Sequence, residues 1–179
     1  AALFQGATPR SAGFNTIDIG SMLTASQFLI IILMFIGAAS GSTGGGIKVN
    51  TLSVLVLATI NTFRGGGQVH AFERKIAQET IMRALAVVMS SLTAVLVIAL
   101  LLTISEGLLE DRFLEILFEA TSAFSTTGLS MGLTSELSAI GKMIVSIAMF
   151  VGRLGPLTLA FALSQRKRSS RIGYPEDHI

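Results

Sequence analysis

Residues 112–130 read RFLEILFEATSAFSTTGLS, which begins as an apolar segment and ends in a loop of small and hydroxyl-bearing residues. The part from Arg112 to Phe124 is too short to cross a bilayer core of roughly 30 Å, but it suffices for a half-helix with Asp111 as its N-cap. The chain must then turn back, and Gly128 lets the backbone point its carbonyl groups inward. Such carbonyls replace the hydration shell of a cation, and the carboxyl end of the half-helix adds negative potential. The stretch therefore predicts a half-helix and a cation-selective loop at membrane depth.

The composition of the whole chain indicates the same solvent. Of 179 residues, 51% are hydrophobic and only 13% are charged, whereas charged residues make up about 25% of ordinary soluble domains. The long apolar runs lack a polar face, so we expect an all-α integral membrane protein. There is no Cys, the two His are far apart, and the predicted spans hold no carboxylate pair. We therefore expect no enzyme activity and no Cys-ligated metal.

Apolar runs of about 20 residues mark candidate membrane spans. Ile81–Ile104 and Ala139–Ser164 are long enough to cross. A third region is apolar over Met22–Ile36 and again over Val49–Phe63, with the glycine-rich stretch Gly37–Gly46 between. Because each glycine costs a helix about 1 kcal/mol, this stretch predicts a broken transmembrane helix. Irregular backbone at membrane depth must be buried in protein or line a water-filled path, so the break is a functional candidate.

Charge placement predicts the topology. The linker 64–80 and the tail 165–179 are basic, which places both on the cytoplasmic side. The segment between the last two predicted spans is acidic and is expected outside, and Asp18 is expected to border the same mouth. Two roles stay open for the acidic segment, namely a solvated loop or a surface that concentrates cations at a pore mouth. Its carboxylates are Glu106, Glu110, Asp111, Glu115, Glu119 and Glu136.

An internal repeat supports the loop prediction. A shift of 115 residues places Gly13 on Gly128 and MFIG at 34–37 on MFVG at 149–152. An isolated Ser-Thr-Thr-Gly sequence could equally form an ordinary extracellular turn, but a second copy at a fixed spacing favours a repeated pore loop. The shift also places Ala38 on Arg153, so the glycine-rich break and this mid-span cation are expected at similar depth. A cation at mid-span costs roughly 2.5 to 3.5 kcal/mol and should face a pore or a partner.

Four motifs in this order resemble the Trk/Ktr/HKT superfamily of potassium transporters, and most closely the C-terminal half of a bacterial KtrB-type pore subunit. They are TPRSAGFNT at 8–16, GSTGGGIK at 41–48, STTGLS at 125–130 and GRLGPL at 152–157. The resemblance implies a pseudo-fourfold pore of consecutive helix, pore loop, helix units. Residues 1–63 would supply a pore loop and the broken helix of the third unit, and 81–164 the complete fourth unit. Two loops cannot close a fourfold filter, so we expect the N-terminal half in a separate chain or a longer gene product.

The resemblance also implies roles for individual residues. The filter carbonyls would come from Ser11, Ala12, Gly13, Phe14, Thr126, Thr127, Gly128 and Leu129. With one glycine in each loop, selectivity is expected to be moderate. The gate below the filter would comprise Gly41, Ser42, Thr43, Gly44, Gly45, Gly46, Lys48 and Arg153. For Lys48, snorkelling to the interface is an equally good explanation.

The same resemblance implies K⁺ as the transported ion, bound by the filter carbonyls, with Na⁺ as an activator and no covalent cofactor. It implies a multi-pass protein of the plasma membrane. The partners expected are membrane lipid, the N-terminal half of the pore subunit, a second full subunit and a cytosolic ring of nucleotide-binding, KtrA-like RCK subunits. No nucleic-acid partner is expected.

Two other functions are compatible with parts of the sequence. A secondary transporter with alternating access would also have a broken helix at mid-membrane, but its repeats would usually be inverted, whereas these two run parallel. A nucleotide-binding loop is suggested by the spacing of Gly41 and Gly46. It fails because Ile47 separates the second glycine from Lys48 and Val49 stands where Ser or Thr is needed.

Overall fold

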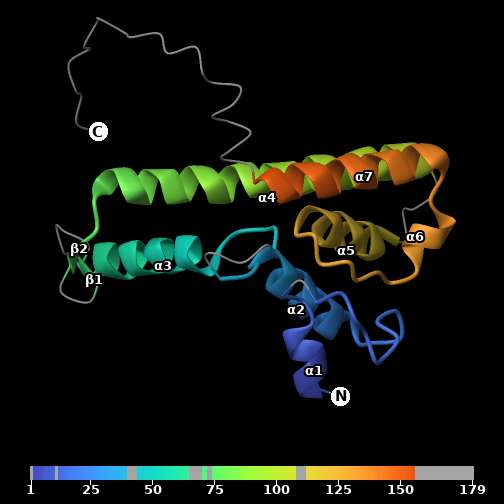
Figure 1. Ribbon diagram of the computed structural model, residues 1–179, viewed down its shortest axis with the longest axis horizontal. Coiled ribbons are helices and arrows are strands. Elements are labelled where there is room, and N and C mark those ends of the chain that lie inside the picture. Colours follow the sequence, from blue (N-terminus) through green and yellow to red (C-terminus); the bar gives the residue numbers. More distant parts are fainter. Residues whose placement is uncertain are drawn as a thin grey trace, which may run out of the picture.

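The computed structural model describes residues 2–10, 12–39, 44–64, 70–71, 74–107 and 112–155. These residues are mostly helical, as the sequence predicts, apart from one antiparallel pair of two-residue strands. Figure 1 shows α4 and α7 side by side, with α3 alongside the other half of α4. The elements are α1 (Ala2–Ala7), α2 (Thr24–Phe35), α3 (Val49–Phe63), β1 (His70–Ala71), β2 (Arg74–Lys75), α4 (Gln78–Glu106), α5 (Phe113–Phe124), α6 (Leu133–Glu136) and α7 (Ala139–Leu154).

Helix α4 contains the predicted span Ile81–Ile104. It has 29 residues, and by length and composition it is the one described helix that could cross a membrane. Only 28% of its most apolar stretch of 18 residues is buried. The core helix of a soluble protein would be covered on most sides. Its exposed apolar side chains include Leu96, Leu100 and Ile104. The helix therefore presents a large apolar surface outward, as an element surrounded by lipid or by further membrane helices does.

The predicted interruption of the first apolar region is confirmed. Helix α2 ends at Phe35 and α3 begins at Val49. The two ends are joined by a parallel bridge between Ile36 and Ile47, and the Ile47 amide donates to the Phe35 carbonyl at 3.1 Å. Ile47, shortly before α3, therefore lies beside the end of α2. Both helices are apolar but shorter than a bilayer crossing.

Helix α5 lies at the centre of the fold and contacts α2, α4 and α7. All seven residues from Phe118 to Phe124 are buried. Ile116, Ala120 and Phe124 belong to one apolar cluster with α4 and α7, and Phe118 belongs to a second one with α2. Arg112 occupies the N-cap position, whereas Asp111, which the sequence predicts there, lies outside the described residues. The segment predicted to be a half-helix is therefore a 12-residue helix enclosed by its neighbours.

Helix α7 is shorter than the apolar run that predicted it. The run extends to Ser164, but the helix ends at Leu154 and Gly155 has a left-handed φ of 78°. Pro156 follows in the sequence, and a residue before proline is disfavoured in the helical region. A Gly-Pro pair thus ends the helix within an apolar sequence.

Candidate functional site

The two loops that the repeat predicts lie in backbone contact. Gly13 and Gly128 both have left-handed φ angles, 71° and 85°. A Cβ added at Gly13 would lie 2.8 Å from the Thr127 carbonyl oxygen, and one added at Gly128 would lie 3.8 Å from the Gly13 Cα. Only glycine adopts this backbone region without strain. The structure therefore brings the centres of two loops 115 residues apart in the sequence to one place.

The loop after α5 is fixed by its own backbone and by the first copy. The Thr127 amide donates to the Ser122 carbonyl at 3.0 Å, and its hydroxyl donates to the Pro9 carbonyl at 3.4 Å. Thr126 has a φ of 53° and is the one described residue other than glycine with positive φ, which is unusual for a β-branched residue. Thr127 and Leu129 are buried, whereas Gly128 is exposed. The loop thus presents its glycine to open space.

The described part of the first loop has hydrogen bonds within its own copy. The Ala12 amide donates to the Thr8 carbonyl at 3.2 Å, and the Thr8 hydroxyl donates to the Phe4 carbonyl at 3.0 Å. Phe14 is 73% exposed, so it projects away from this part of the fold. The predicted filter residue Ser11 lies outside the described residues.

The described part of the glycine-rich break lies against the carboxyl end of α5. The Gly45 amide donates to the Thr126 Oγ1 at 2.9 Å, and a Cβ at Gly45 would lie 3.0 Å from the Phe124 carbonyl oxygen. Gly46 has a left-handed φ, and a Cβ added there would lie 3.2 Å from the Ser125 hydroxyl. The break and the second loop are therefore one connected structure. No local sequence signal could have found the bond between Gly45 and Thr126, because it joins residues 81 positions apart.

Lys48 and Arg153 border this structure from two sides. The Lys48 ammonium donates to the Gly44 carbonyl at 2.7 Å. Arg153 is exposed in the last turn of α7. Its neighbour Gly152 packs so closely on α5 that a Cβ there would lie 1.8 Å from the Phe124 carbonyl oxygen. Arg153 and the break thus lie near the same end of α5, while Gly41, Ser42 and Thr43 lie outside the described residues.

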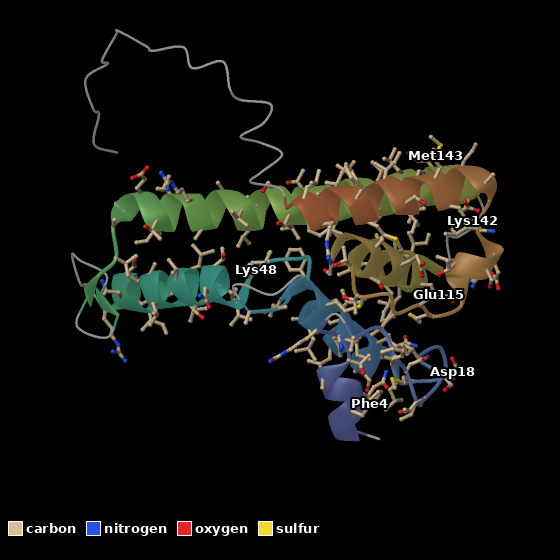
Figure 2. The ribbon with its side chains drawn as sticks, viewed as in Figure 1. Phe4, Asp18, Lys48, Glu115, Lys142 and Met143 are labelled. Atoms are coloured by element: carbon tan, nitrogen blue, oxygen red, sulfur yellow. The ribbon has the colours of Figure 1, made fainter. Side chains whose placement is uncertain are left out.

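The described acidic residues do not form one solvated group. Glu119 is buried, so its prediction as an outward-facing carboxylate was wrong. Arg112 pairs with Glu115 and Glu136, and these hydrogen bonds raise the pKa of its guanidinium above the usual value. Figure 2 shows Asp18, Glu115 and Lys142 toward one end of the molecule, with Lys48 at the inner end of α3. Among the described residues, no cluster of three or more His, Cys, Asp or Glu could hold a metal ion.

Glu106 joins two helices at that same end. Its carboxylate, in the last turn of α4, accepts hydrogen bonds from the amide and the hydroxyl of Ser138, the latter at 2.8 Å. The Ser138 hydroxyl in turn accepts from the Gly141 amide and caps α7. Glu106 therefore contributes to the packing of α7 on α4.

The family described as TrkH, cation transport protein, matches residues 1–172. The chain belongs to this family. It is 44% identical over its full length to the Ktr system potassium uptake protein B of Bacillus subtilis and 42% identical to the protein of the same name from Vibrio alginolyticus. A potassium/sodium uptake protein, NtpJ, of Enterococcus hirae is 38% identical over 98% of the chain.

The chain spans 38% to 40% of the length of these three relatives. The predicted kinship with the KtrB-type subunits of the TrkH family is thus confirmed, and the similar region is a part of each relative. The names of these relatives describe uptake of potassium, or of potassium and sodium, and not catalysis.

Proposed function

We propose that this chain forms part of a pore for K⁺ uptake across the plasma membrane, with the loops around Gly13 and Gly128 as two of the four segments of its filter. K⁺ is the cargo, held in turn by backbone carbonyl oxygens, and Na⁺ acts as an activator. Sodium is included because one relative is named a potassium/sodium uptake protein.

The observation that carries the proposal is the meeting of two left-handed glycines. Each occurs in a loop that follows an apolar helix, and the two loops are in backbone contact. A cation needs several carbonyl groups directed at one point, and converging loops provide them without any charged side chain. The exposed Gly128 leaves room beside this contact for the loops of an N-terminal half.

The proposed gate is the break between α2 and α3, together with Arg153. Its support is the position of the break against the carboxyl end of α5, where the Gly45 amide is hydrogen-bonded to Thr126. Helix α7 brings Arg153 to the same end through the close contact of Gly152. A cation that had passed the filter would next meet the irregular loop and a guanidinium. Movement of the loop away from α5 would open this path.

The basic segments 64–80 and 165–179 are proposed to be cytoplasmic, and the acidic end with Glu115 to face outward. Two full subunits would pair, and a cytosolic ring of nucleotide-binding subunits would regulate them from the basic side. These features follow from the charge pattern and from the family resemblance.

The break between α2 and α3 also supports a second candidate, a secondary transporter with alternating access. In that case the break itself would bind the ion, and the loops at Gly13 and Gly128 would serve as closures. The two candidates predict different consequences of altering Gly128, because only a filter sets ion preference at that position.

The experiment compares Gly128→Ser with Gly107→Ser in the complete transporter, expressed in cells that lack other potassium uptake. Gly107 is also left-handed, with a φ of 61°, but a Cβ there meets nothing within 4 Å and the residue caps α4 away from the loops. Both variants therefore carry a similar backbone strain. We expect Gly128→Ser to lose K⁺ uptake or its preference over Na⁺, at normal amounts in the membrane, while Gly107→Ser keeps both. Unchanged uptake and preference in Gly128→Ser would refute the filter and favour alternating access.

A further inference from the structure

Helix α5 contains a charged side chain where the environment is least favourable for one. Glu119 is 4% exposed, and it is the one charged residue among the buried side chains of the described part of the chain. Burying an ionised carboxylate is costly unless hydrogen bonds replace the water that it loses. An apolar residue of similar volume would stabilise this helix without the desolvation cost of a buried charge. A specific geometric role is therefore the better explanation for a carboxylate here.

Both oxygens of this carboxylate bind the chain that leaves the second loop. The Ser130 hydroxyl donates to Glu119 Oε2 at 2.8 Å, and the Thr134 hydroxyl donates to Glu119 Oε1. The Ser130 hydroxyl also accepts a hydrogen bond from the Gly132 amide at 3.1 Å. Glu119 thus fastens the segment just after the loop to the helix just before it.

The hydrogen bond between Ser130 and Glu119 links the two ends of the proposed filter segment. Residues 125–129 leave α5 at Phe124, and Ser130, the next residue, is tied back to α5 through Glu119. The carbonyl groups of Gly128 and Leu129 lie one or two residues from that tie. Because hydrogen bonds to a charged group are shorter and stronger than neutral ones, the tie restricts where these two carbonyls can point.

The first copy of the repeat has no such tie. The shift of 115 residues places Phe4, Asn15 and Ile19 at the positions of Glu119, Ser130 and Thr134. Phe4 is 44% exposed and its side chain cannot accept a hydrogen bond. Figure 2 shows Phe4 on α1, on the far side of the molecule from α4 and α7. The two loops are therefore similar in backbone but are held in different ways.

We propose that Glu119 is a positioning residue that sets the ion preference of the filter by fixing the outer end of the second loop through Ser130 and Thr134. The proposal rests on the proposed function, because it presupposes that residues 126–129 bind the ion. Glu119 itself does not touch the ion. Removal of the tie should let the loop relax and so weaken the binding of K⁺ more than that of Na⁺, which needs a different arrangement of oxygens.

The test uses the complete transporter and measures KM for K⁺, maximal rate, Na⁺ competition and the amount of protein in the membrane. We expect Glu119→Ala to raise KM roughly tenfold, which corresponds to about 1.4 kcal/mol, because both hydrogen bonds to the carboxylate are lost, and to reduce the preference for K⁺. Glu119→Gln keeps one accepting oxygen and should show a smaller shift in the same direction. Glu79→Gln, at an exposed carboxylate in the first turn of α4 that pairs with Arg83 of the same helix, is the control and should match the wild type.

A variant of Ser130, which donates a hydrogen bond to Glu119, serves as a control for a folding defect in Glu119→Ala. Ser130→Ala removes the 2.8 Å hydrogen bond and leaves the carboxylate in place, so it should shift KM and preference in the same direction. Wild-type KM and preference in both Glu119→Gln and Ser130→Ala would overturn the proposal. If Gly128→Ser changes ion preference while these variants do not, only the positioning role fails. If Gly128→Ser is also without effect, the filter itself is refuted.

Discussion

The two copies of the repeat begin alike and end differently. Helix α2 begins at Thr24 and α7 at Ala139, the same separation of 115 residues that relates Gly13 to Gly128. Helix α2 ends at Phe35, however, and the chain loops out before α3, whereas α7 continues for one more turn to Leu154. In the first copy the sequence from Gly37 is GAASGSTGGG, and in the second the sequence from Gly152 is GRLGPLTLAF. The glycine-rich sequence thus follows a helix that ends one turn earlier than its equivalent in the second copy.

The difference shows how one motif can serve two purposes. Gly37 and Gly152 are equivalent in the repeat, and in both a Cβ would collide with backbone. At Gly152 the obstacle is the end of α5, and at Gly37 it is the Gly45 carbonyl, 2.2 Å from the added atom. The second copy therefore uses its glycine to pack a helix, and the first uses it to fold the break onto itself.

The largest effect is expected from Gly152→Val. Its Cβ would fall 1.8 Å from the Phe124 carbonyl oxygen, and because both groups belong to packed helices, relief requires α7 to move off α5. We expect a loss of about 3 kcal/mol or more in stability, measured as melting temperature and yield in detergent. Gly6→Ala, where a Cβ meets nothing within 4 Å, is the control. Normal melting of Gly152→Val would show that α7 does not pack as described.

Gly37→Ala sharpens the same comparison. Its obstacle belongs to an irregular loop, which can shift more easily than a helix. The variant should therefore fold with a smaller loss of stability than Gly152→Val but with altered flux at rest. If the two equivalent glycines gave equal losses of stability and no change in flux, the distinction between a packing glycine and a loop glycine would be lost.

Arg153→Ala is expected to change flux without changing folding. Arg153 is exposed in the described chain, and its removal from the proposed path should raise maximal K⁺ uptake by up to about tenfold, which corresponds to about 1.4 kcal/mol. Lys142→Ala is the matched control, because Lys142 is an exposed cation at the opposite end of the same helix. Unchanged flux and regulation in Arg153→Ala would remove this residue from the gate.

The smallest effect is expected from Thr126→Val, which keeps the shape of the side chain and removes the acceptor for the Gly45 amide. A hydrogen bond of this kind is worth about 1 kcal/mol, so flux at rest should rise by about fivefold as the break detaches from the loop. Thr103→Val, which removes a hydroxyl bonded only to the Ala99 carbonyl of its own helix, should have no such effect. Equal flux in the two variants would mean that break and loop move independently.

Much of this architecture could be predicted from the sequence because its signals are local or repeated. The length and hydropathy of α4, the glycine-rich interruption after Phe35 and the equivalence of Gly13 and Gly128 in the repeat all follow from composition or periodicity. The Gly-Pro pair at 155–156 also indicates the end of α7 at Leu154, but hydropathy alone extended the predicted helix to Ser164. Family membership followed from four motifs in order.

Contacts between distant segments could not be predicted in this way. The burial of Glu119 depends on how α5 is enclosed by its neighbours, and in the sequence it looks like one more acid in an acidic segment. The left-handed Thr126 and its bond to Gly45 likewise depend on tertiary packing, which overrides the usual backbone preference of a β-branched residue. The buried carboxylate of Glu119 also distinguishes the two copies, because Phe4 occupies the equivalent position.

The most direct measurement is an experimental structure of the complete transporter with Rb⁺ or Tl⁺ in place of K⁺, with the heavy ion located by its scattering. Our account predicts ion density beside Gly13 and Gly128, within coordination distance of carbonyl oxygens from residues 12–14 and 126–129. Ion density at the break between α2 and α3, with none beside the two glycines, would contradict it.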